Sequence, residues 1–389
     1  MRIGIFTDSY KPYIGGVVRS IELFTEELRK LGHEVIIFAP KYPGVQKEKD
    51  VFRFPAIPTP TYKGFYLGIP FSTGLERFLE QHPPDVIHVQ SPFLLGRLGA
   101  RVARKLGVPL VFTYHTLYDQ YTHYVPFARE FSKGITRKVC VDFCNRCDLV
   151  ITPTEIISNH IRNMGVKANV KWLPTGIQLD EFTGLDRSWL RKTYGLAPDE
   201  LILLFVGRAG KEKNIPFIIE CFAEVRKQYP KTKLVLVGEG PESENLKKYA
   251  GDLRLTDHVI FAGKLSSEDL VKAYGGADLF VFGSLTETQG IVLAEAKAAG
   301  LPVVAVNAYG VSNMVVDGDD GFLVNPELHS FVQKIVLLIE DDELRKRMGD
   351  RALKNVQQLS SRNCTEKLVT YYKSLLDGVN RPGWQVNAQ

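Results

Sequence analysis

The sequence predicts an α/β protein built from two tandem, doubly wound domains. Its most apolar segments are short, nearly continuous runs of Val, Ile, Leu and Phe that alternate with helix-like stretches, which indicates parallel sheets buried on both faces. A polar segment at residues 176–196 interrupts the alternation, which then restarts. A length of 389 residues is also long for one hydrophobic core. We therefore expect one domain over residues 1–173 and a second over 174–362.

The first domain can be assigned element by element. The strand "RIGIFTD" at 2–8, a loop with two glycines, an amphipathic helix near 17–31 and the strand "EVIIFAP" at 34–40 form a β-loop-α-β unit. Such a unit implies a parallel sheet with a right-handed crossover. The elements that follow are strand 85–90, helix 94–106, strand 109–115, a long helical stretch to 147, strand 149–154, helix 155–164 and strand 170–176.

The second domain repeats the pattern. Its expected elements are strand 201–208, helix 215–228, strand 233–240, helix 243–250, strand 258–263, helix 267–273, strand 279–284, a helix within 286–301, strand 302–306 and strand 321–325. Doubly wound sheets bind their ligands outside the carboxyl ends of the strands. We therefore expect a cleft with one ligand side on each domain, and chemistry in the loops that follow strands.

Composition excludes several classes of protein. With 44% hydrophobic and 24% charged residues the chain is globular, and no apolar run approaches the roughly 18 residues that span a bilayer. The N-terminus enters a strand without a signal-peptide pattern, so we expect a cytoplasmic protein with reduced thiols among its five cysteines. Cys140, Cys144 and Cys147 have the spacing of some iron–sulfur sites, but the same spacing is one face of a helix, and we favour the buried helix face.

Charge is distributed unevenly along the chain. Residues 1–175 hold 23 Lys and Arg against 15 Asp and Glu, whereas the remainder has a net charge of −3. A basic first half suits an anionic partner such as a membrane surface or a phosphorylated ligand. No nucleic-acid recognition motif accompanies the basic residues, so a nucleic-acid partner is not expected.

Charged residues and glycines follow strands of the second domain. Arg208 and Lys213 in "VGRAGKEKN" suit a diphosphate, with Lys211 and Glu212 between them interpreted as solvated charges. Gly238 in "VGEGPE" would allow close backbone approach to a ligand or would simply form a turn. The segment "TETQGIVLAEAKAAGLPVV" contains Glu287 and Glu295, and the second of these lies in a stretch apolar enough to be buried. The acidic "DGDDGF" near Asp317 is interpreted as a turn rather than a metal site.

Two features of the first domain could face the same ligand. Gly15 and Gly16 open the first helix, where unpaired backbone N–H groups could meet a phosphate or a sugar, or where a plain tight turn could form. His115 ends a strand and could hydrogen-bond a sugar hydroxyl, or could be satisfied by the protein itself.

Together these motifs resemble the retaining glycosyltransferases of family four, whose GT-B architecture is two Rossmann-like domains facing a cleft. The resemblance covers most of the chain and implies roles for its residues. Glu287 would bind hydroxyls of the donor sugar, and Glu295 the nucleotide ribose. Arg208 and Lys213 would neutralise the diphosphate, the backbone of Gly290 and Ile291 would face phosphate, and His115 would contact the sugar. A C-terminal helix, over about 363–389, would pack back on the first domain.

The acceptor is suggested by a narrower resemblance. "ETQG" and "TYHTLYDQYTHYV" look like segments of bacterial 1,2-diacylglycerol 3-glucosyltransferases. This implies transfer of glucose from UDP-glucose to diacylglycerol, without a cofactor or an essential metal, by a peripheral protein at the inner face of the cell membrane. A phosphatidylinositol mannosyltransferase, a transferase with a soluble acceptor, a nucleotide-sugar epimerase and a non-catalytic sugar-binding protein remain alternatives.

Aromatic and basic residues of the first domain suit an anionic membrane. The segment "TYKGFYLGIPF" is rich in aromatic residues, and the helical stretch before residue 147 carries several cations. Our candidates for contact with the acceptor or the membrane are Phe65, Tyr66, Asp119, Arg129, Lys133, Arg137 and Lys138.

Overall fold

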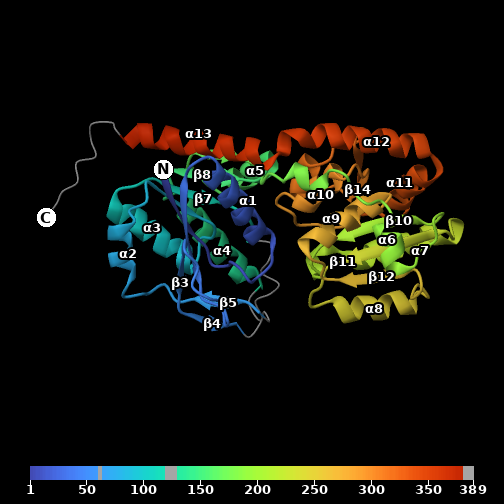
Figure 1. Ribbon diagram of the computed structural model, residues 1–389, viewed down its shortest axis with the longest axis horizontal. Coiled ribbons are helices and arrows are strands. Elements are labelled where there is room, and N and C mark those ends of the chain that lie inside the picture. The colour runs from blue at the N-terminus through green and yellow to red at the C-terminus, as the bar shows by residue number, and fades with distance from the viewer. Residues whose placement is uncertain (60–63, 119–128, 380–389) are drawn as a thin grey trace. The chain divides into compact units, whose positions relative to one another are not determined.

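A computed structural model describes residues 1–59, 64–118 and 129–379, without the side chains of 129–133 and 379. The chain forms two compact units (Figure 1). Met1–Gly176 and the C-terminal segment from Ser361 make the first unit, and Ile177–Ser360 makes the second. The second unit is thus inserted, in sequence, between two parts of the first.

The first unit is built around a seven-stranded sheet in the order β3-β2-β1-β6-β7-β8-β9, with every pair parallel. The central strands are buried because their residues are Val, Ile, Leu and Phe. The strands are β1 (Arg2–Phe6), β2 (Glu34–Pro40), β3 (Val51–Phe54), β6 (Val86–Val89), β7 (Leu110–Thr113), β8 (Leu149–Thr152) and β9 (Val170–Trp172). The helices are α1 (Gly16–Lys30), α2 (Leu75–Gln81), α3 (Leu94–Leu106), α4 (Arg129–Cys144), α5 (Glu155–Asn163) and α13 (Ser361–Val379).

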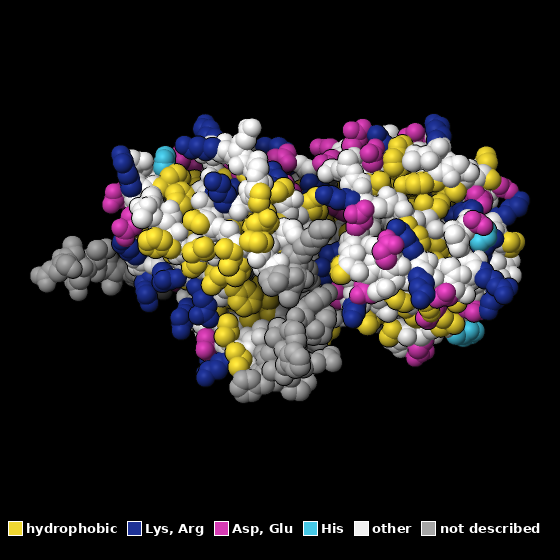
Figure 2. All heavy atoms as spheres, turned by 90° about the horizontal axis from the view of Figure 1, so that it is seen from below, with side chains coloured by type: hydrophobic (Ala, Val, Ile, Leu, Met, Phe, Trp, Pro, Cys, Tyr) yellow, Lys and Arg dark blue, Asp and Glu magenta, His cyan; other side chains and the backbone are white. Residues whose placement is uncertain are grey.

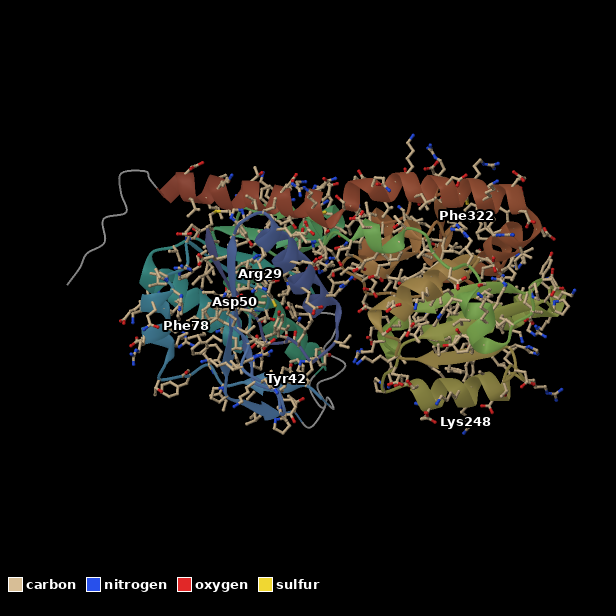
Figure 3. All side chains as sticks on the ribbon, in the orientation of Figure 1. Arg29, Tyr42, Asp50, Phe78, Lys248 and Phe322 are labelled. Carbon is tan, nitrogen blue, oxygen red and sulfur yellow. The ribbon has the colours of Figure 1, made fainter. Side chains whose placement is uncertain are left out.

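Sequence analysis missed the elements between residues 51 and 81. β3 extends the sheet at its edge, and Arg29 of α1 forms an ion pair of 3.2 Å with Asp50 just before it; Figure 3 labels both residues. A short antiparallel hairpin follows, made of β4 (Ala56–Pro58) and β5 (Tyr66–Gly68). Strands of three residues give too short a pattern for a periodicity argument to detect.

The C-terminal helix α13 packs against α1 and contributes Leu368 and Tyr372 to the core of the first unit (Figure 1). The hydroxyl of the fully buried Tyr372 lies 2.6 Å from Nδ1 of His88, whose Nε2 lies 2.6 Å from the hydroxyl of Thr113. A neutral imidazole has one donor and one acceptor nitrogen, and hydroxyls can serve either. This chain of bonds links α13 to two neighbouring strands.

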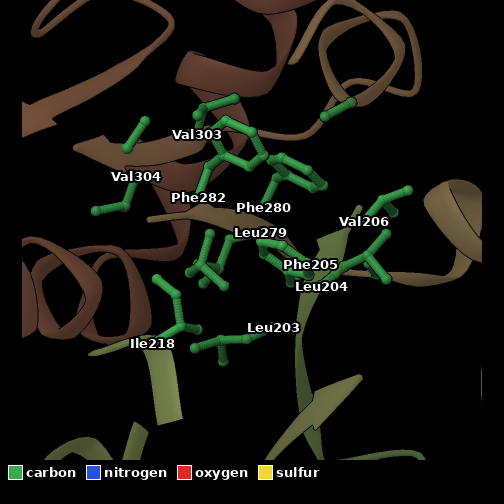
Figure 4. Close-up of a cluster of buried hydrophobic side chains, with 14 of the residues drawn as sticks. Leu203, Leu204, Phe205, Val206, Ile218, Leu279, Phe280, Phe282, Val303 and Val304 are labelled. Carbon is green, nitrogen blue, oxygen red and sulfur yellow. The ribbon is translucent and has the colours of Figure 1, made fainter. Parts of the chain in front are cut away.

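The second unit contains a six-stranded parallel sheet in the order β12-β11-β10-β13-β14-β15. Figure 4 shows its core, where side chains of β10, β13 and β14 pack together with Ile218. The strands are β10 (Leu201–Val206), β11 (Thr232–Val237), β12 (Val259–Gly263), β13 (Leu279–Phe282), β14 (Val303–Val306) and β15 (Gly321–Val324). The α-helices are α6 (Trp189–Tyr194), α7 (Ile215–Gln228), α8 (Ser243–Asp252), α9 (Ser267–Gly276), α10 (Ile291–Ala298), α11 (Leu328–Glu340) and α12 (Asp342–Asn355).

The acidic "DGDDGF" segment is a turn, as the sequence predicts, and its carboxylates have protein partners. Asp320 is fully buried and forms an ion pair of 2.6 Å with Lys297 of α10. Asp319 binds Arg351 of α12 at 2.6 Å. A buried charge is tolerated only when it is paired and hydrogen-bonded, so this turn has a structural role.

The three cysteines expected on a helix face are buried, with Cys140 and Cys144 in α4 and Cys147 just after it. Burial raises the pKa of the Cys144 thiol to about 12, so this sulfur stays protonated. Within the described part of the chain, no helix combines the length and the apolar character needed to cross a membrane.

Candidate functional site

The first group of site residues follows β10, the central strand of the second unit. Arg208 comes after the strand, and the short 3-10 helix η3 (Lys211–Lys213) follows at once. One terminal nitrogen of Arg208 donates a hydrogen bond of 2.8 Å to Oε1 of Glu212. Because these cations directly follow β10, which lies between β11 and β13, they occupy the carboxyl edge near the middle of the sheet, where such folds bind ligands.

Glu212 is not the solvated charge that the sequence suggested. It is buried, whereas its neighbour Lys211 is exposed. A Cβ atom placed on Gly210 would lie only 2.4 Å from Oε2 of Glu212, so a glycine at 210 makes room for the carboxylate. The carbonyl of Glu212 also accepts hydrogen bonds from Ser284 and Leu285, which follow β13. Glu212 therefore anchors Arg208 and joins two strand-end loops.

Lys213 and Glu287 form an ion pair, although 74 positions separate them in the sequence. Lys213 follows β10 and Glu287 follows β13, and these two strands are paired. Both side chains keep some exposure, 18% for Lys213 and 16% for Glu287, so a ligand can reach the pair. The structure thus brings together three residues that the sequence predicted for one site: Arg208, Lys213 and Glu287.

Helix α10 begins at Ile291, next to this pair, as the sequence predicts. Gly290 precedes the helix with φ 81°, in the left-handed region that favours glycine. No side chain caps this end of the helix. The first N–H groups of an α-helix lack intrahelical partners and carry partial positive charge, which attracts an anion such as a phosphate.

Glu295 lies further along α10 and is buried. Its Oε2 accepts a hydrogen bond of 2.9 Å from the hydroxyl of Tyr274 in α9. Burial, and then the neighbouring carboxylate, raise the pKa of Tyr274 well above its usual range, so the phenol remains a donor. Sequence analysis missed this partner, which lies on another helix, 21 positions away.

Gly238 has a steric role. A Cβ atom at this position would lie 2.0 Å from the carbonyl oxygen of Gly207, the residue that follows β10. With φ 123° its backbone also adopts a conformation that other residues rarely reach. Close packing of two neighbouring loops is thus sufficient reason for glycine here.

In the first unit, Gly15 and Gly16 lie at the start of α1 as expected. Gly15 is the N-cap residue, in an extended conformation, and no side chain caps the helix. A Cβ atom at Gly16 would meet nothing within 4 Å, so this turn presents open backbone. Such an end offers the same anion-binding N–H groups as α10.

His115 follows β7 in the first unit. Its Nε2 lies 2.6 Å from Oε1 of Gln90, a buried residue that follows the neighbouring strand β6. An amide oxygen only accepts, so Nε2 carries the proton. Burial lowers the pKa of His115 to about 4, and the ring is therefore neutral at pH 7. Sequence analysis missed Gln90. This residue could have been noticed because it is polar and directly follows the apolar strand "VIHV".

Asp8 is a second residue that sequence analysis missed at the edge of this sheet. It follows β1 and is buried. The hydroxyl of Ser91 donates to one carboxylate oxygen, and the backbone N–H of Leu95 donates to the other at 2.9 Å. Burial raises the pKa of Asp8, while these hydrogen bonds lower it in part. Asp8 thus fixes the start of α3 against the central strand.

The candidates for membrane contact divide into three groups. The rings of Phe65 and Tyr66 are half-buried against Tyr13 and Tyr42, at centroid distances of 5.3 and 5.2 Å. Arg137 and Lys138 are exposed on α4, and Arg137 also donates to the carbonyl of Met164 after α5 at 3.1 Å. Asp119 and the side chains of Arg129 and Lys133 lie outside the described residues.

Apolar side chains other than the two named candidates are exposed near the hairpin, and two of them, Ile69 and Phe71, lie in the aromatic-rich segment 61–71 that the sequence indicated. Ile57 is 53% exposed, Ile69 42% and Phe71 69%. They lie in or directly after β4 and β5, the part of the first unit toward the bottom of Figure 1. Figure 2 views the molecule from that side and shows hydrophobic side chains gathered on the first unit.

Comparison with known proteins supports this picture of the fold. Residues 14–181 match the model of glycosyltransferase family 4, and residues 186–355 match that of the group 1 glycosyl transferases. An alpha-monoglucosyldiacylglycerol synthase of Streptococcus pneumoniae is 36% identical over 82% of this chain and 74% of its own length. Another, from Acholeplasma laidlawii, is 31% identical over 98% of this chain and 99% of its own.

A solved structure has the same fold over nearly the whole chain. Sucrose-phosphate synthase from Thermosynechococcus elongatus has a TM-score of 0.82 and 22% identity, and the match covers 97% of this chain and 99% of that one.

Two parallel α/β units, with cations and a carboxylate at the strand ends of the second, define a nucleotide-sugar-dependent hexosyltransferase of the GT-B fold. The chain belongs to the group 1 and family 4 glycosyltransferases. The fold and the enzyme class predicted from the sequence are therefore confirmed.

Proposed function

We propose that this enzyme transfers glucose from UDP-glucose to diacylglycerol, with retention of the anomeric configuration, at the inner face of the cell membrane. The observation that carries the donor side is the cluster of Arg208, Lys213 and Glu287 at the start of α10. The acceptor is argued from the names of the two similar synthases.

On the donor side, the charges suit a sugar diphosphate. Arg208 is oriented by Glu212 and would bind phosphate oxygens through its guanidinium group, while Lys213 would add a point charge. The N–H groups at Ile291 would stabilise the negative charge that grows as the diphosphate departs. Glu287, exposed in part, would accept hydrogen bonds from sugar hydroxyls, and Glu295 from the ribose.

In the transfer itself, the bond between the sugar C1 and the diphosphate oxygen breaks as C1 bonds to the acceptor oxygen. We propose that the departing phosphate oxygen, on the same face of the sugar, takes the acceptor hydroxyl proton, so the products are UDP and the glycolipid. His115, neutral and with its Nε2 proton donated to Gln90, would accept a hydrogen bond from a sugar hydroxyl rather than carry charge. Differential binding of the developing phosphate charge would then supply much of the rate enhancement.

On the acceptor side, the hairpin of the first unit supports a lipid. Ile57, Ile69 and Phe71 expose apolar surface, and the first 175 residues carry an excess of positive charge. Apolar side chains next to cations suit the headgroup region of an anionic bilayer. These features favour a peripheral enzyme over one with a soluble acceptor.

The test is product formation from radiolabelled UDP-glucose and diacylglycerol in mixed micelles that contain anionic lipid, with thin-layer separation. We expect a labelled glucosyl lipid whose anomeric proton coupling, measured by NMR, is that of the α-anomer. Label transferred only to water, or to a soluble alcohol, would overturn the lipid acceptor. Transfer from GDP-mannose in place of UDP-glucose would overturn the donor and favour a mannosyltransferase.

We also propose that no metal is required, because cationic side chains and a helix N-terminus can balance the diphosphate. Activity in excess EDTA should stay within roughly twofold of that of the untreated enzyme. The protein itself supplies the positive charge that a metal ion would otherwise provide to the diphosphate. Loss of activity that Mg²⁺ or Mn²⁺ restores would contradict this proposal.

A further inference from the structure

A tyrosine at the carboxyl edge of the second sheet has an unusual backbone conformation. Tyr309 follows β14 and is the first residue of the short 3-10 helix η4 (Tyr309–Asn313), and its φ is 40°. Glycine adopts this left-handed region readily, whereas a bulky residue found there is an outlier that indicates a turn or strain. Strained residues of this kind cluster at functional sites.

The other two non-glycine residues with positive φ in the described part of the chain have local explanations. Asn214, with φ 52°, is of a residue type that tolerates the left-handed region, because its short polar side chain can hydrogen-bond locally. Arg254, with φ 59°, directly follows the C-cap of α8, a position where many helices place a left-handed residue. Tyr309 follows a strand instead, so neither explanation applies to it.

The segment that begins at Tyr309 is held in place by α10 and by the loop before that helix. The N–H of Gly310 donates a hydrogen bond of 2.9 Å to the carbonyl of Glu287. At the end of η4, the carbonyl of Met314 accepts a hydrogen bond of 2.9 Å from the buried Lys297 of α10. A strained backbone persists only where contacts of this kind over-determine it.

The residue after Tyr309 lies directly against the loop that carries Glu287. A Cβ atom on Gly310 would lie 2.1 Å from the carbonyl oxygen of Thr288, so the two loops are in backbone contact. Strand β14 pairs with β13 on the side away from β10. Along this edge of the sheet, the two cations of the site therefore follow β10, Glu287 follows β13 and Tyr309 follows β14.

The fold alone does not account for a tyrosine at this position. Tyr309 is half-buried and, among the described residues, it is not one of those that pack against the hydrophobic core of the second unit. A glycine would adopt the same backbone without strain. An aromatic ring, however, offers an apolar face to the C–H groups of a hexose, and its hydroxyl can exchange hydrogen bonds with sugar hydroxyls.

We propose that Tyr309 is a sugar-binding residue that contacts the hexose of the donor on the side away from the diphosphate. This inference rests on the proposed function, in that the donor is a nucleotide sugar held by Arg208, Lys213 and Glu287. A sugar whose diphosphate lies after β10, and whose hydroxyls reach Glu287 after β13, extends toward the loop after β14. Tyr309 would thereby help to select the hexose without contacting the nucleotide.

The test compares the binding of UDP-glucose with that of UDP, by isothermal titration calorimetry without an acceptor. Tyr309→Gly removes the ring and relieves the strain, whereas Tyr309→Phe keeps the ring and removes the hydroxyl. The matched control is Arg254→Gly, which relieves left-handed strain at an exposed turn that precedes β12 and lies outside the site. Urea unfolding of each variant is measured alongside.

We expect Tyr309→Gly to bind UDP-glucose roughly tenfold more weakly than the wild type, and UDP within roughly twofold of it. Tyr309→Phe should bind both ligands within roughly threefold of the wild type. Arg254→Gly should bind both as the wild type does. The urea midpoint of Tyr309→Gly should equal or exceed that of the wild type, because glycine suits this backbone.

A lower urea midpoint in Tyr309→Gly, with equal losses of UDP and UDP-glucose binding, would identify a structural residue and overturn the proposal. Unchanged UDP-glucose binding in this variant would do the same. If the wild type bound neither UDP nor UDP-glucose, the donor of the proposed function would fail. The comparison would then use GDP and GDP-mannose, where a loss confined to the sugar nucleotide would support the role of Tyr309 and its absence would overturn it.

Discussion

At the scale of single residues, the site depends on carboxylates that hold cations in place. Glu212 anchors Arg208, and Glu287 pairs with Lys213. Sequence alone could not distinguish these carboxylates from solvated ones, because Lys211 and Glu212 are adjacent and equally polar. Only the fold shows that one is exposed and the other buried. The site therefore consists of two ion pairs with different accessibility.

Replacing Glu287 should harm turnover far more than folding. In Glu287→Ala we expect kcat to fall roughly a hundredfold or more, because a group that binds the reacting sugar is lost. Stability should fall by about 1–2 kcal/mol, since Lys213 loses its partner but remains 18% exposed and can be partly hydrated. Steady-state kinetics and urea unfolding measure the two effects.

The matched control for Glu287 is Glu244→Ala, which breaks an exposed ion pair with Lys247 in the same unit. It should leave both kcat and the unfolding midpoint unchanged. Parallel losses of turnover and stability in Glu287→Ala would identify Glu287 as a structural residue.

Glu212 should act through Arg208. In Glu212→Gln, Arg208 loses its charged partner, and we expect UDP to inhibit roughly tenfold more weakly, in line with the strength of hydrogen bonds to charged groups. The change should appear mainly in the KM for the donor. Lys211→Gln, an exposed neighbour, is the control. Unchanged UDP inhibition in Glu212→Gln would show that its carboxylate serves the fold only.

At the scale of elements, α13 is joined to the first unit by a polar contact inside an apolar interface. Leu368 and Tyr372 contribute to the core. The hydroxyl of Tyr372 also forms a hydrogen bond with the ring of His88 in β6. Apolar contacts favour burial without fixing orientation, whereas a buried hydrogen bond requires one geometry. The histidine therefore fixes how α13 lies on α1 and the sheet.

Removing that hydroxyl should destabilise the first unit. Tyr372→Phe leaves a buried nitrogen of His88 without its partner, which costs about 1–3 kcal/mol. The neighbouring and half-exposed Tyr371→Phe should change stability little. Urea unfolding followed by tyrosine fluorescence would compare them, and equal effects would contradict the role of the His88 contact.

The same histidine should make stability depend on pH. Burial, and then His115, lower the pKa of His88 to about 3, and burial lowers that of His115 to about 4. An unfolded histidine titrates near 6.5, so the unfolded chain binds more protons below that pH. Stability should be full above pH 6.5 and should fall on acidification, by on the order of 1 kcal/mol per pH unit for each histidine.

Nitrogen NMR of histidine-labelled protein measures this directly. Both rings should remain neutral at pH 5, and guanidinium unfolding at pH 7 and pH 5 should show the loss of stability. Titration of either ring with a midpoint near 6.5 would refute the assignment for that residue.

At the scale of the whole molecule, the alternation of strands and helices could be predicted from the sequence, whereas individual side-chain partners could not. Runs such as "LILLFV" and "LFVF" are apolar because both faces of a parallel sheet are covered, so the strands of both sheets could be recognised except for the edge strand β3. Motifs after those strands located Arg208, Lys213, Glu287 and the start of α10. Tyr274, Gln90 and the buried Glu212 escaped prediction, because partners across the fold leave no mark in the sequence around them.

The insertion of the second unit has a consequence for synthesis on the ribosome. Residues 1–176 emerge first, but α13, which completes their core, emerges only after all of Ile177–Ser360 has been made. Until then the faces that receive Leu368 and Tyr372 stay open to water. The first unit of the nascent chain therefore exposes apolar surface while the second unit is synthesised and folds. A chaperone that covers this surface would be most useful during that period.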